Sequence, residues 1–282
     1  MGTFATASVQ DLKRLLELFP IANLRQAWPD TKGTKEEICF AAAESKDYSK
    51  IAGFIDEHFS CCKQHVYVFM KPAGEEQLPP MLLDEPPVVE ITGVRSVYVL
   101  RARYSVVLRS PLEETFIDFL WPIRLEITED RNHAVLRFVV LEKAVTQYFD
   151  RPCYVPDRSI DEKAIIKDVE LWAPERVDIH KGIKDLWENG FMDSSSATLK
   201  KALSMASEKM DEELGIREHN PELYEQIQDN TLLNALFAIT DEEKCGVSVF
   251  SVQPSNGYLA FLRYSEKGGP DFVISEILRK NQ

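Results

Sequence analysis

The chain has 282 residues and a formal net charge of −13, with 44% hydrophobic and 28% charged residues. These values are ordinary for a folded globular protein, and they exclude a disordered chain, a collagen-like fibre and a disulfide-rich miniprotein. The length allows one large domain or two ordinary ones. The acidic balance argues against indiscriminate binding to nucleic acid or to an anionic membrane, because the field of the whole molecule repels phosphates.

The sequence predicts a cytoplasmic protein without a membrane partner. It contains no run of about 18 apolar residues, so no transmembrane helix is expected. Segment 1–10 lacks the basic and apolar pattern of a secretory signal. The five cysteines are scattered and form no CxxC pair, which favours reduced thiols in the cytosol.

The chain begins with a series of predicted helices that extends over residues 8–70. Apolar residues recur at helical spacing over 12–19. Thr34 followed by Glu37 is a capping box, which predicts a helix start at this point. A further helix is predicted over 48–62, with apolar residues on one face.

The middle segment, 88–141, is predicted to form antiparallel strands. Every second residue is apolar over 98–108, which is typical of a half-buried strand. Strands are also expected at 123–128 and 134–141, on either side of a turn at 129–132. Short consecutive strands joined by short turns imply an antiparallel sheet with one buried face.

The rest of the chain is expected to return to helix and to end on a hairpin. Segment 159–240 is predicted to be mostly helical, including an amphipathic helix over 199–210. Asn220 followed by proline is a helix start. Strands are expected within 245–266, and a terminal helix follows 268–270.

We therefore expect an α+β protein, with an N-terminal helical module and a mainly antiparallel sheet packed with helices. Prolines and acidic residues crowd the segment after the first helices, a composition typical of a linker. The expected division is a helical module at 1–71, a linker at 72–87 and an α+β domain at 88–282, with its sheet from 88–141 and 245–266 and its helices from 159–240.

One possible metal site lies at the end of the first helical segment. On a helix, His58, Cys62 and His65 would share one face, and imidazole and thiolate are zinc ligands. The spacing matches no standard zinc module, and Cys62 continues the apolar stripe of Ile51 and Phe59. A structural role as a buried thiol is therefore the favoured interpretation, and no metal or other cofactor is predicted.

A second candidate is a row of arginines on the predicted strand. These residues have odd numbers, so they would project from one face of an unbroken strand: Arg95, Arg101, Arg103 and Arg109. Arginine binds phosphate and carboxylate groups through bidentate contacts, so the row could bind a nucleic-acid backbone, a nucleotide or an acidic partner. Pairing with internal acids such as Glu126 is the favoured interpretation.

A third candidate is the loop 32–35, which carries Lys32 and Lys35 next to a glycine. A basic loop that leads into a helix N-terminus can bind an anion. A solvated loop is the favoured interpretation. If the protein binds nucleic acid, these two lysines and the arginine row are the expected contacts.

The sequence contains none of the common catalytic or nucleotide-binding motifs: no GxSxG, P-loop, GxGxxG or HExxH. We therefore assign no catalytic residue. The leading hypothesis is a non-enzymatic intracellular interaction or regulatory protein that acts through a protein partner. One alternative is a nucleic-acid-binding protein that uses the basic strand face and the loop. Another is a motif-poor hydrolase or nuclease with a site assembled from distant residues. The residues identify no protein family.

Overall fold

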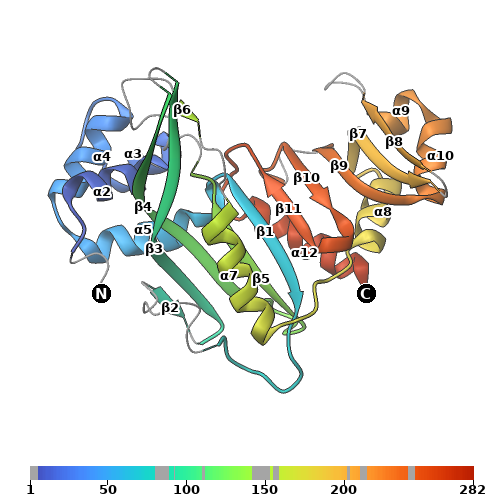
Figure 1. Cartoon of the computed structure of the whole chain (residues 1–282), viewed down its shortest axis with the longest axis horizontal. Coiled ribbons are helices and arrows are strands. Elements are labelled where there is room, and N and C mark those ends of the chain that lie inside the picture. The colour runs from blue at the N-terminus through green and yellow to red at the C-terminus, as the bar shows by residue number, and fades with distance from the viewer. Residues whose placement is uncertain are drawn as a thin grey trace. The chain divides into compact units, whose positions relative to one another are not determined.

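The chain folds into two units, and each combines helices with an antiparallel sheet, which confirms the predicted α+β class (Figure 1). Unit 1 comprises residues 1–62 and 70–175, and unit 2 comprises residues 63–69 and 176–282. Unit 1 therefore holds the N-terminal helices together with the strands that follow them. This computed structural model describes residues 6–79, 89–91, 93–109, 112–141, 153–154, 159–201, 204–209, 215–240 and 245–282. The expected linker at 72–87 stays a prediction, because residues 80–87 lie outside these ranges.

The N-terminal helices begin at side-chain caps. The capping box predicted at Thr34 is confirmed: its hydroxyl accepts from the Glu37 amide, and the Glu37 carboxylate accepts from the Thr34 amide. Ser8 caps the first helix in the same way with Asp11. The helices are α2 (Val9–Glu17), α3 (Ile21–Ala27), α4 (Lys35–Glu44) and α5 (Tyr48–His58), and the short helix η1 (Phe59–Cys61) follows.

These helices share an apolar core. The Phe54 ring lies 5.0 Å from that of Phe19 and 4.9 Å from that of Trp28, centroid to centroid. Leu12 and Leu15 are buried on the inner side of α2. The apolar stripes that predicted the helices therefore form their packing surface.

The sheet of unit 1 contains one long hairpin. Its strand order is β2-β3-β4-β5, with β6 paired to β3, and all described pairs are antiparallel. The strands predicted from alternation are confirmed, and the second is longer than expected. The strands are β2 (Val89–Ile91), β3 (Arg95–Arg109), β4 (Leu112–Ile127), β5 (His133–Val139) and β6 (Cys153–Tyr154).

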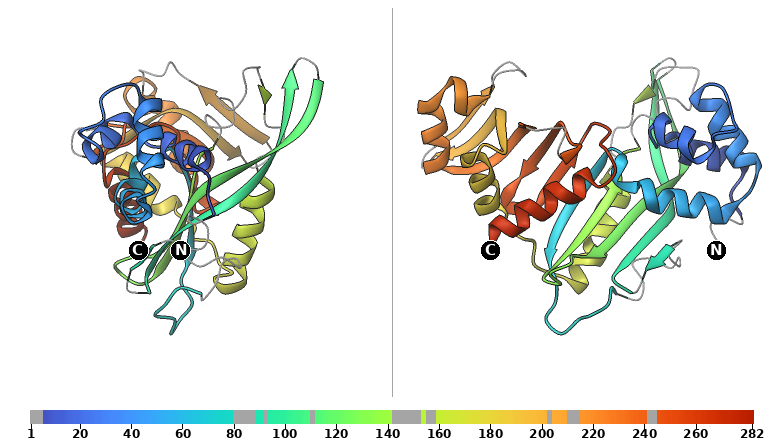
Figure 2. Two further views of the ribbon diagram at one scale, coloured as in Figure 1. Left: turned by 90° about the vertical axis from the view of Figure 1, so that its left-hand side faces the viewer. Right: turned by 180° about the vertical axis from the view of Figure 1, so that it is seen from behind.

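The two faces of this sheet are covered differently. Figures 1 and 2 show α2–α5 on one face and α7 (Ser159–Trp172) along the other. On α7, the buried side chains include Ile165, Ile166 and Val169. Both layers bury apolar residues, as an α+β arrangement requires.

The prediction of helix up to residue 70 is wrong after the short helix η1, which ends at Cys61. Residues Gln64–Met70 form strand β1, which pairs with the end of the chain and belongs to unit 2. The sequence QHVYVFM is rich in β-branched and aromatic residues, which pack well on a sheet. His65 therefore lies on a strand, and the helical spacing from His58 to His65 does not exist.

Unit 2 is built around a six-strand antiparallel sheet in the order β1-β11-β10-β9-β7-β8. The predicted final hairpin, the cap at Asn220 and the terminal helix are confirmed. The remaining strands are β7 (Met192–Lys201), β8 (Ser204–Lys209), β9 (Thr231–Ile239), β10 (Val249–Gln253) and β11 (Tyr258–Phe261). The helices are α8 (His180–Glu188), α9 (Ile216–His219), α10 (Pro221–Asp229), α12 (Gly269–Asn281) and the short η2 (Pro254–Asn256).

The amphipathic helix predicted over 199–210 is wrong, and so is the mostly helical reading of 159–240. Residues Met192–Lys201 and Ser204–Lys209 form the hairpin β7–β8, and β7 also pairs with β9. Alternate apolar residues of β7, including Ala197 and Leu199, are buried. Pairing with β9 outweighs a helical spacing that depended on four residues.

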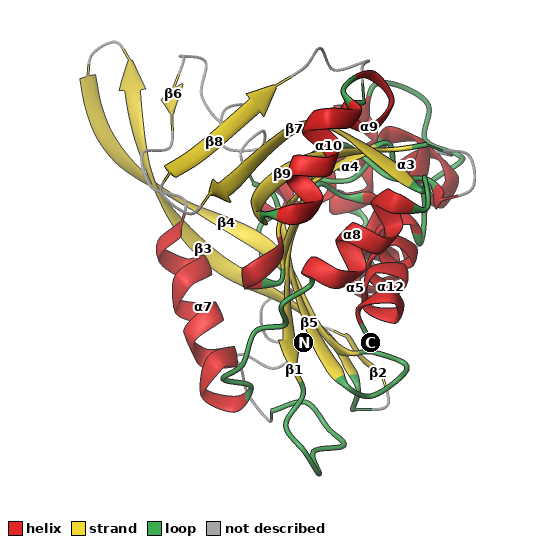
Figure 3. Ribbon diagram, turned by 90° about the vertical axis from the view of Figure 1, so that its right-hand side faces the viewer, coloured by secondary structure: helices red, strands yellow, loops and turns green. Residues whose placement is uncertain are grey.

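Helices α8 and α12 pack side by side against this unit (Figure 3). Their close approach requires a glycine, because a Cβ at Gly182 would collide with the backbone oxygen of Ile277. Trp187 of α8 lies edge-on to Phe237 of β9, with ring centroids 5.0 Å apart. The terminal helix is thereby fixed to the same core as α8.

Candidate interaction surface

The inner end of the arginine face of β3 lies against the N-terminal helices. Arg95 pairs with Asp56 of α5 at 3.1 Å, and Arg101 lies 3.7 Å from Asp11 of α2. The side chains of Arg103 and Arg109 lie outside the described part of the structure. Two of the four arginines in the predicted row thus have acids of this chain beside them.

The same face carries buried arginines on the next two strands. Arg124 of β4 is 4% exposed, and its guanidinium lies 4.6 Å from the Phe59 ring centre and donates to the Asp56 carbonyl oxygen. Arg137 of β5 forms an ion pair with Glu126 at 2.6 Å. The Arg124 contacts tie the end of α5 to the sheet, and the Arg137–Glu126 pair joins β5 to β4, so both have a structural role.

The loop 32–35 uses its charges internally. Lys35 Nζ donates to the Glu17 carbonyl oxygen at the end of α2, at 2.6 Å. The Glu37 carboxylate occupies the N-terminus of α4, and its hydrogen bonds with Thr34 lower its pKa below the usual value. An internal carboxylate therefore fills the position at which a phosphate would bind, and Lys32 is the exposed cation of this loop.

The three possible zinc ligands have other neighbours. His58 Nδ1 is 2.8 Å from Asn23 Nδ2, and the His65 ring packs on Tyr258. Burial, followed by the neighbouring Cys61, raises the pKa of the Cys62 thiol well above its usual value. A thiol in this environment resists forming the thiolate that binds zinc. Among the described residues, no group of three His, Cys, Asp or Glu side chains is placed to hold a metal ion.

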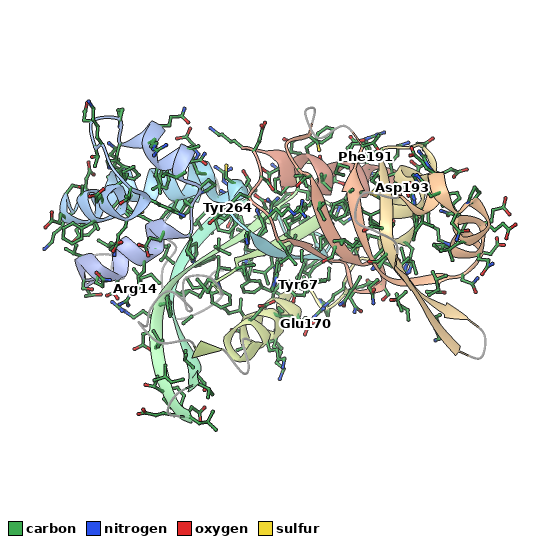
Figure 4. All side chains as sticks on the ribbon, turned by 90° about the horizontal axis from the view of Figure 1, so that it is seen from above. Arg14, Tyr67, Glu170, Phe191, Asp193 and Tyr264 are labelled. Carbon is green, nitrogen blue, oxygen red and sulfur yellow. The ribbon has the colours of Figure 1, made fainter. Side chains whose placement is uncertain are left out.

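The outer half of the β3–β4 hairpin, which we call the arm, comprises residues 103–109 and 112–118. Its two strands pair from Arg103 opposite Asp118 to Arg109 opposite Leu112. In Figures 2 and 4 the arm extends clear of helices α2–α5. Arg14 of α2, labelled in Figure 4, lies 6.0 Å from the Phe119 ring centre, beside the inner end of the arm.

The arm has one buried and one exposed face. Val106, Leu108 and Ile117 are buried on one side. On the other side Leu112 is 79% exposed and Phe116 is 64% exposed. Large apolar side chains in such positions are typical of surfaces that bind another molecule.

The exposed part of β4 is also acidic. Its exposed side chains include Glu113, Glu114 and Asp118, of which Glu114 and Asp118 share the face of Phe116. Glu114 accepts a hydrogen bond from the Ser105 hydroxyl. Segment 112–118, with the sequence LEETFID, contains no basic residue. The surface therefore combines a small apolar patch with carboxylates of β4, and Arg103 and Arg109 of β3 hold the register positions opposite Asp118 and Leu112.

Sequence reasoning missed this surface because it began the second strand at Ile123 instead of Leu112. The sequence did carry a sign of this surface, because apolar residues lie at both even and odd positions of the segment. Phe116 has the parity of one face, whereas Ile117 and Phe119 have the parity of the other. In a strand, apolar residues on both faces indicate that the second face is also meant to be covered.

Unit 2 contains a polar cluster that sequence reasoning also missed. Asp193, labelled in Figure 4, accepts hydrogen bonds at Oδ1 from Trp187 Nε1 and from the amides of Ser194 and Arg217. One carboxylate oxygen thus joins α8, β7 and α9. These contacts fix the elements relative to one another, and they resemble a structural joint more than a binding site.

The comparisons with known proteins give no relatives: no family model, no curated protein and no solved structure matches the chain. None of the described helices is long and apolar enough to span a membrane.

Proposed function

We propose that the chain is a non-enzymatic, cytoplasmic interaction or regulatory protein that binds a protein partner through the arm. The observation that carries the proposal is the exposure of Leu112 and Phe116 on a projecting hairpin. Aromatic residues are enriched at protein interfaces, where they contribute a large contact area. Four cysteines are buried and form no disulfide with another described residue, which is in keeping with a reducing compartment: Cys39, Cys61, Cys62 and Cys245.

The charges near the arm favour a protein over a nucleic acid as the partner. Arg95 and Arg101 lie beside acids of the N-terminal helices, and Lys35 binds a backbone oxygen. The outer part of β4 adds carboxylates, which repel phosphates. A polyanion would therefore meet fewer available cations than the sequence alone indicates.

The test is affinity capture from native lysate with the full chain, with and without nuclease. The double variant Leu112→Ser with Phe116→Ser should lose the partner, because serine removes the apolar contact area. Leu171→Ser, at a position 86% exposed on α7, is the matched control and should retain it. Both variants should fold normally, because exposed positions contribute little to stability.

A partner that is captured equally by both variants would contradict the assignment to the arm. A partner that is lost after nuclease treatment would favour the nucleic-acid alternative and move attention to Lys32 and Arg101.

A further inference from the structure

Unit 2 contains two Asn-Gly pairs, Asn189 with Gly190 and Asn256 with Gly257. In such a pair the glycine nitrogen can attack the asparagine side chain, because glycine has no side chain to hinder the approach. The two pairs share this chemistry, so the surrounding structure decides how readily each of them reacts. The property is independent of the arm and of the proposed function.

Asn189 is restrained by the helix that it ends. It is the C-cap of α8, and its Nδ2 donates to the Asp185 carbonyl oxygen at 2.8 Å and to Asp185 Oδ2 at 3.0 Å. The Gly190 amide donates to the Trp187 carbonyl oxygen at 3.1 Å. The side chain under attack and the attacking nitrogen are therefore both held by hydrogen bonds.

Asn256 is less restrained. It is exposed and ends the short helix η2, which is closed by the hydrogen bond from the Gly257 amide to the Pro254 carbonyl oxygen at 3.2 Å. The Asn256 carboxamide forms no hydrogen bond with any residue that the structure describes. Such a tight turn has hydrogen bonds of poorer geometry than an α-helix. When this bond opens, the peptide plane between the two residues can rotate, because glycine tolerates the new φ.

We propose that Asn256 is a site of spontaneous deamidation in the folded protein and that Asn189 is protected from the same reaction. The Gly257 nitrogen loses its proton to solvent base and bonds to Asn256 Cγ, and the Cγ–Nδ2 bond breaks to release ammonia. Water then opens the cyclic imide, which yields aspartate by attack at Cγ and isoaspartate by attack at the main-chain carbonyl carbon. Asparagine and water are thus converted to a carboxyl group and ammonia, and nothing is oxidised or reduced.

The isoaspartate product does not fit the turn. Its main chain runs through Cβ and Cγ, so it has one more carbon atom before Gly257 than asparagine has. The Cα of Gly257 is closely approached by the Val68 and Val177 carbonyl oxygens. The Gly257 carbonyl oxygen also accepts from the Val68 amide at 2.9 Å. In a close-packed interior the extra atom displaces Gly257, so this hydrogen bond between β1 and the turn should open.

The experiment incubates the full chain at mildly alkaline pH in water enriched in heavy oxygen, and peptide mass spectrometry measures the label at each asparagine. Each product takes an oxygen atom from water, so the label marks newly formed product. In the folded chain Asn256 should react at least about tenfold faster than Asn189, because two additional hydrogen bonds hold the Asn189 side chain. In guanidinium chloride the two rates should become similar, because these hydrogen bonds are lost on unfolding. Equal rates in the folded chain, a faster rate at Asn189 or no label at Asn256 would overturn the inference.

A second measurement tests the effect of the product on the turn. After incubation, amide hydrogen exchange in β1 and β11 should be faster in the parent chain and unchanged in Asn256→Gln, because glutamine has to close a larger ring and deamidates more slowly. Fresh Asn256→Asp carries the charge of one product on a normal main chain, so its exchange should also match that of the fresh parent chain. Faster exchange in Asn256→Asp would assign the effect to charge. Unchanged exchange in a parent chain that has formed isoaspartate would show that the turn accommodates it. Either result would overturn the expected opening of the turn.

Discussion

Arg124 joins the N-terminal helices to the sheet of unit 1. It is 4% exposed, stacks on Phe59 and donates to Asp56. Removing one partner of a buried charged contact leaves the other without compensation. We predict that Arg124→Ala lowers the free energy of unfolding by about 3–5 kcal/mol, as measured by chemical denaturation.

The matched control is Arg131→Ala. The Arg131 side chain is 60% exposed and forms an ion pair with the exposed Glu76. Exposed ion pairs contribute about 1 kcal/mol or less, so this variant should remain close to the parent protein. Similar losses for the two variants would show that Arg124 is not a buried anchor.

The cap at Thr34 gives a prediction that depends on pH. Hydrogen bonds with Thr34 hold the pKa of Glu37 below its usual value. A lowered pKa in the folded state means that the stabilisation is complete above the unfolded value, about 4.3, and is lost as the pH falls through the folded value. Thr34→Ala keeps the backbone hydrogen bond to Glu37 and removes the one from the hydroxyl, so it should raise the pKa of Glu37 part of the way toward its usual value. An NMR titration of the Glu37 carboxyl group measures this change.

The same variant should also lose about 1 kcal/mol of stability at neutral pH, because it removes the side-chain cap of α4. The difference from the parent protein should shrink in acid, where Glu37 becomes protonated in both. If the stability difference between Thr34→Ala and the parent protein grew as the pH falls, the ionised Glu37 carboxylate would not be the group that stabilises the cap.

At the scale of single residues, the sequence indicated which kind of contact a side chain makes better than it indicated which residues surround that side chain. It predicted that Arg95 would share a strand face with other arginines, and it favoured internal pairing, which the Arg95–Asp56 contact matches. The acid comes from α5, 39 residues earlier, and no local pattern shows which helix will cover a strand. The exposure of Phe116 was equally hidden, because exposure depends on elements that are distant in the sequence.

At the scale of elements, the turn between β10 and β11 depends on a close approach. Gly257 has a φ of +57°, and a Cβ there would lie 2.7 Å from the Val68 oxygen and 2.8 Å from the Val177 oxygen. We predict that Gly257→Ala costs at least about 1 kcal/mol more in unfolding free energy than Gly74→Ala. Gly74 is the matched control, because its φ is +81° and a Cβ would meet open space. Equal losses of unfolding free energy in the two variants would mean that backbone strain accounts for the whole effect and that the close approach at Gly257 contributes nothing.

Elements with local signals were predicted correctly. The capping box of α4, the cap at Asn220 and the strand alternation of β3 each depend on neighbouring residues. The hairpin β7–β8 was mistaken for a helix because its stability comes from β9, whose residues lie well beyond the local sequence of β7, as in the pair Met192 and Ile239. The strand β1 was missed for the same reason, since its partner β11 lies near the other end.

At the scale of the whole molecule, unit 2 includes a strand from the first quarter of the chain. Val66 of β1 is fully buried and lies opposite Leu259 of β11. We predict that Val66→Ala costs about 2 kcal/mol and speeds amide hydrogen exchange in β10 and β11 more than in α2 and α4. Leu15→Ala, in the core of unit 1, should give the opposite regional pattern. Faster exchange in α2 and α4 alone for Val66→Ala would contradict the assignment of β1 to unit 2.

Unit 2 is made of two separate stretches of the chain, so its strands are synthesised at different times. Residues 63–69 leave the ribosome before the 70–175 segment, and β11 at Tyr258–Phe261 is made much later. At about 5–20 residues per second, β1 waits roughly ten to forty seconds for the strand beside it in unit 2. During that interval the nascent chain carries an apolar strand whose β11 edge is open. Unit 1 can therefore mature while unit 2 is still being synthesised, whereas unit 2 closes only once β11 has been made, and β1 is the segment that a chaperone would have to shield.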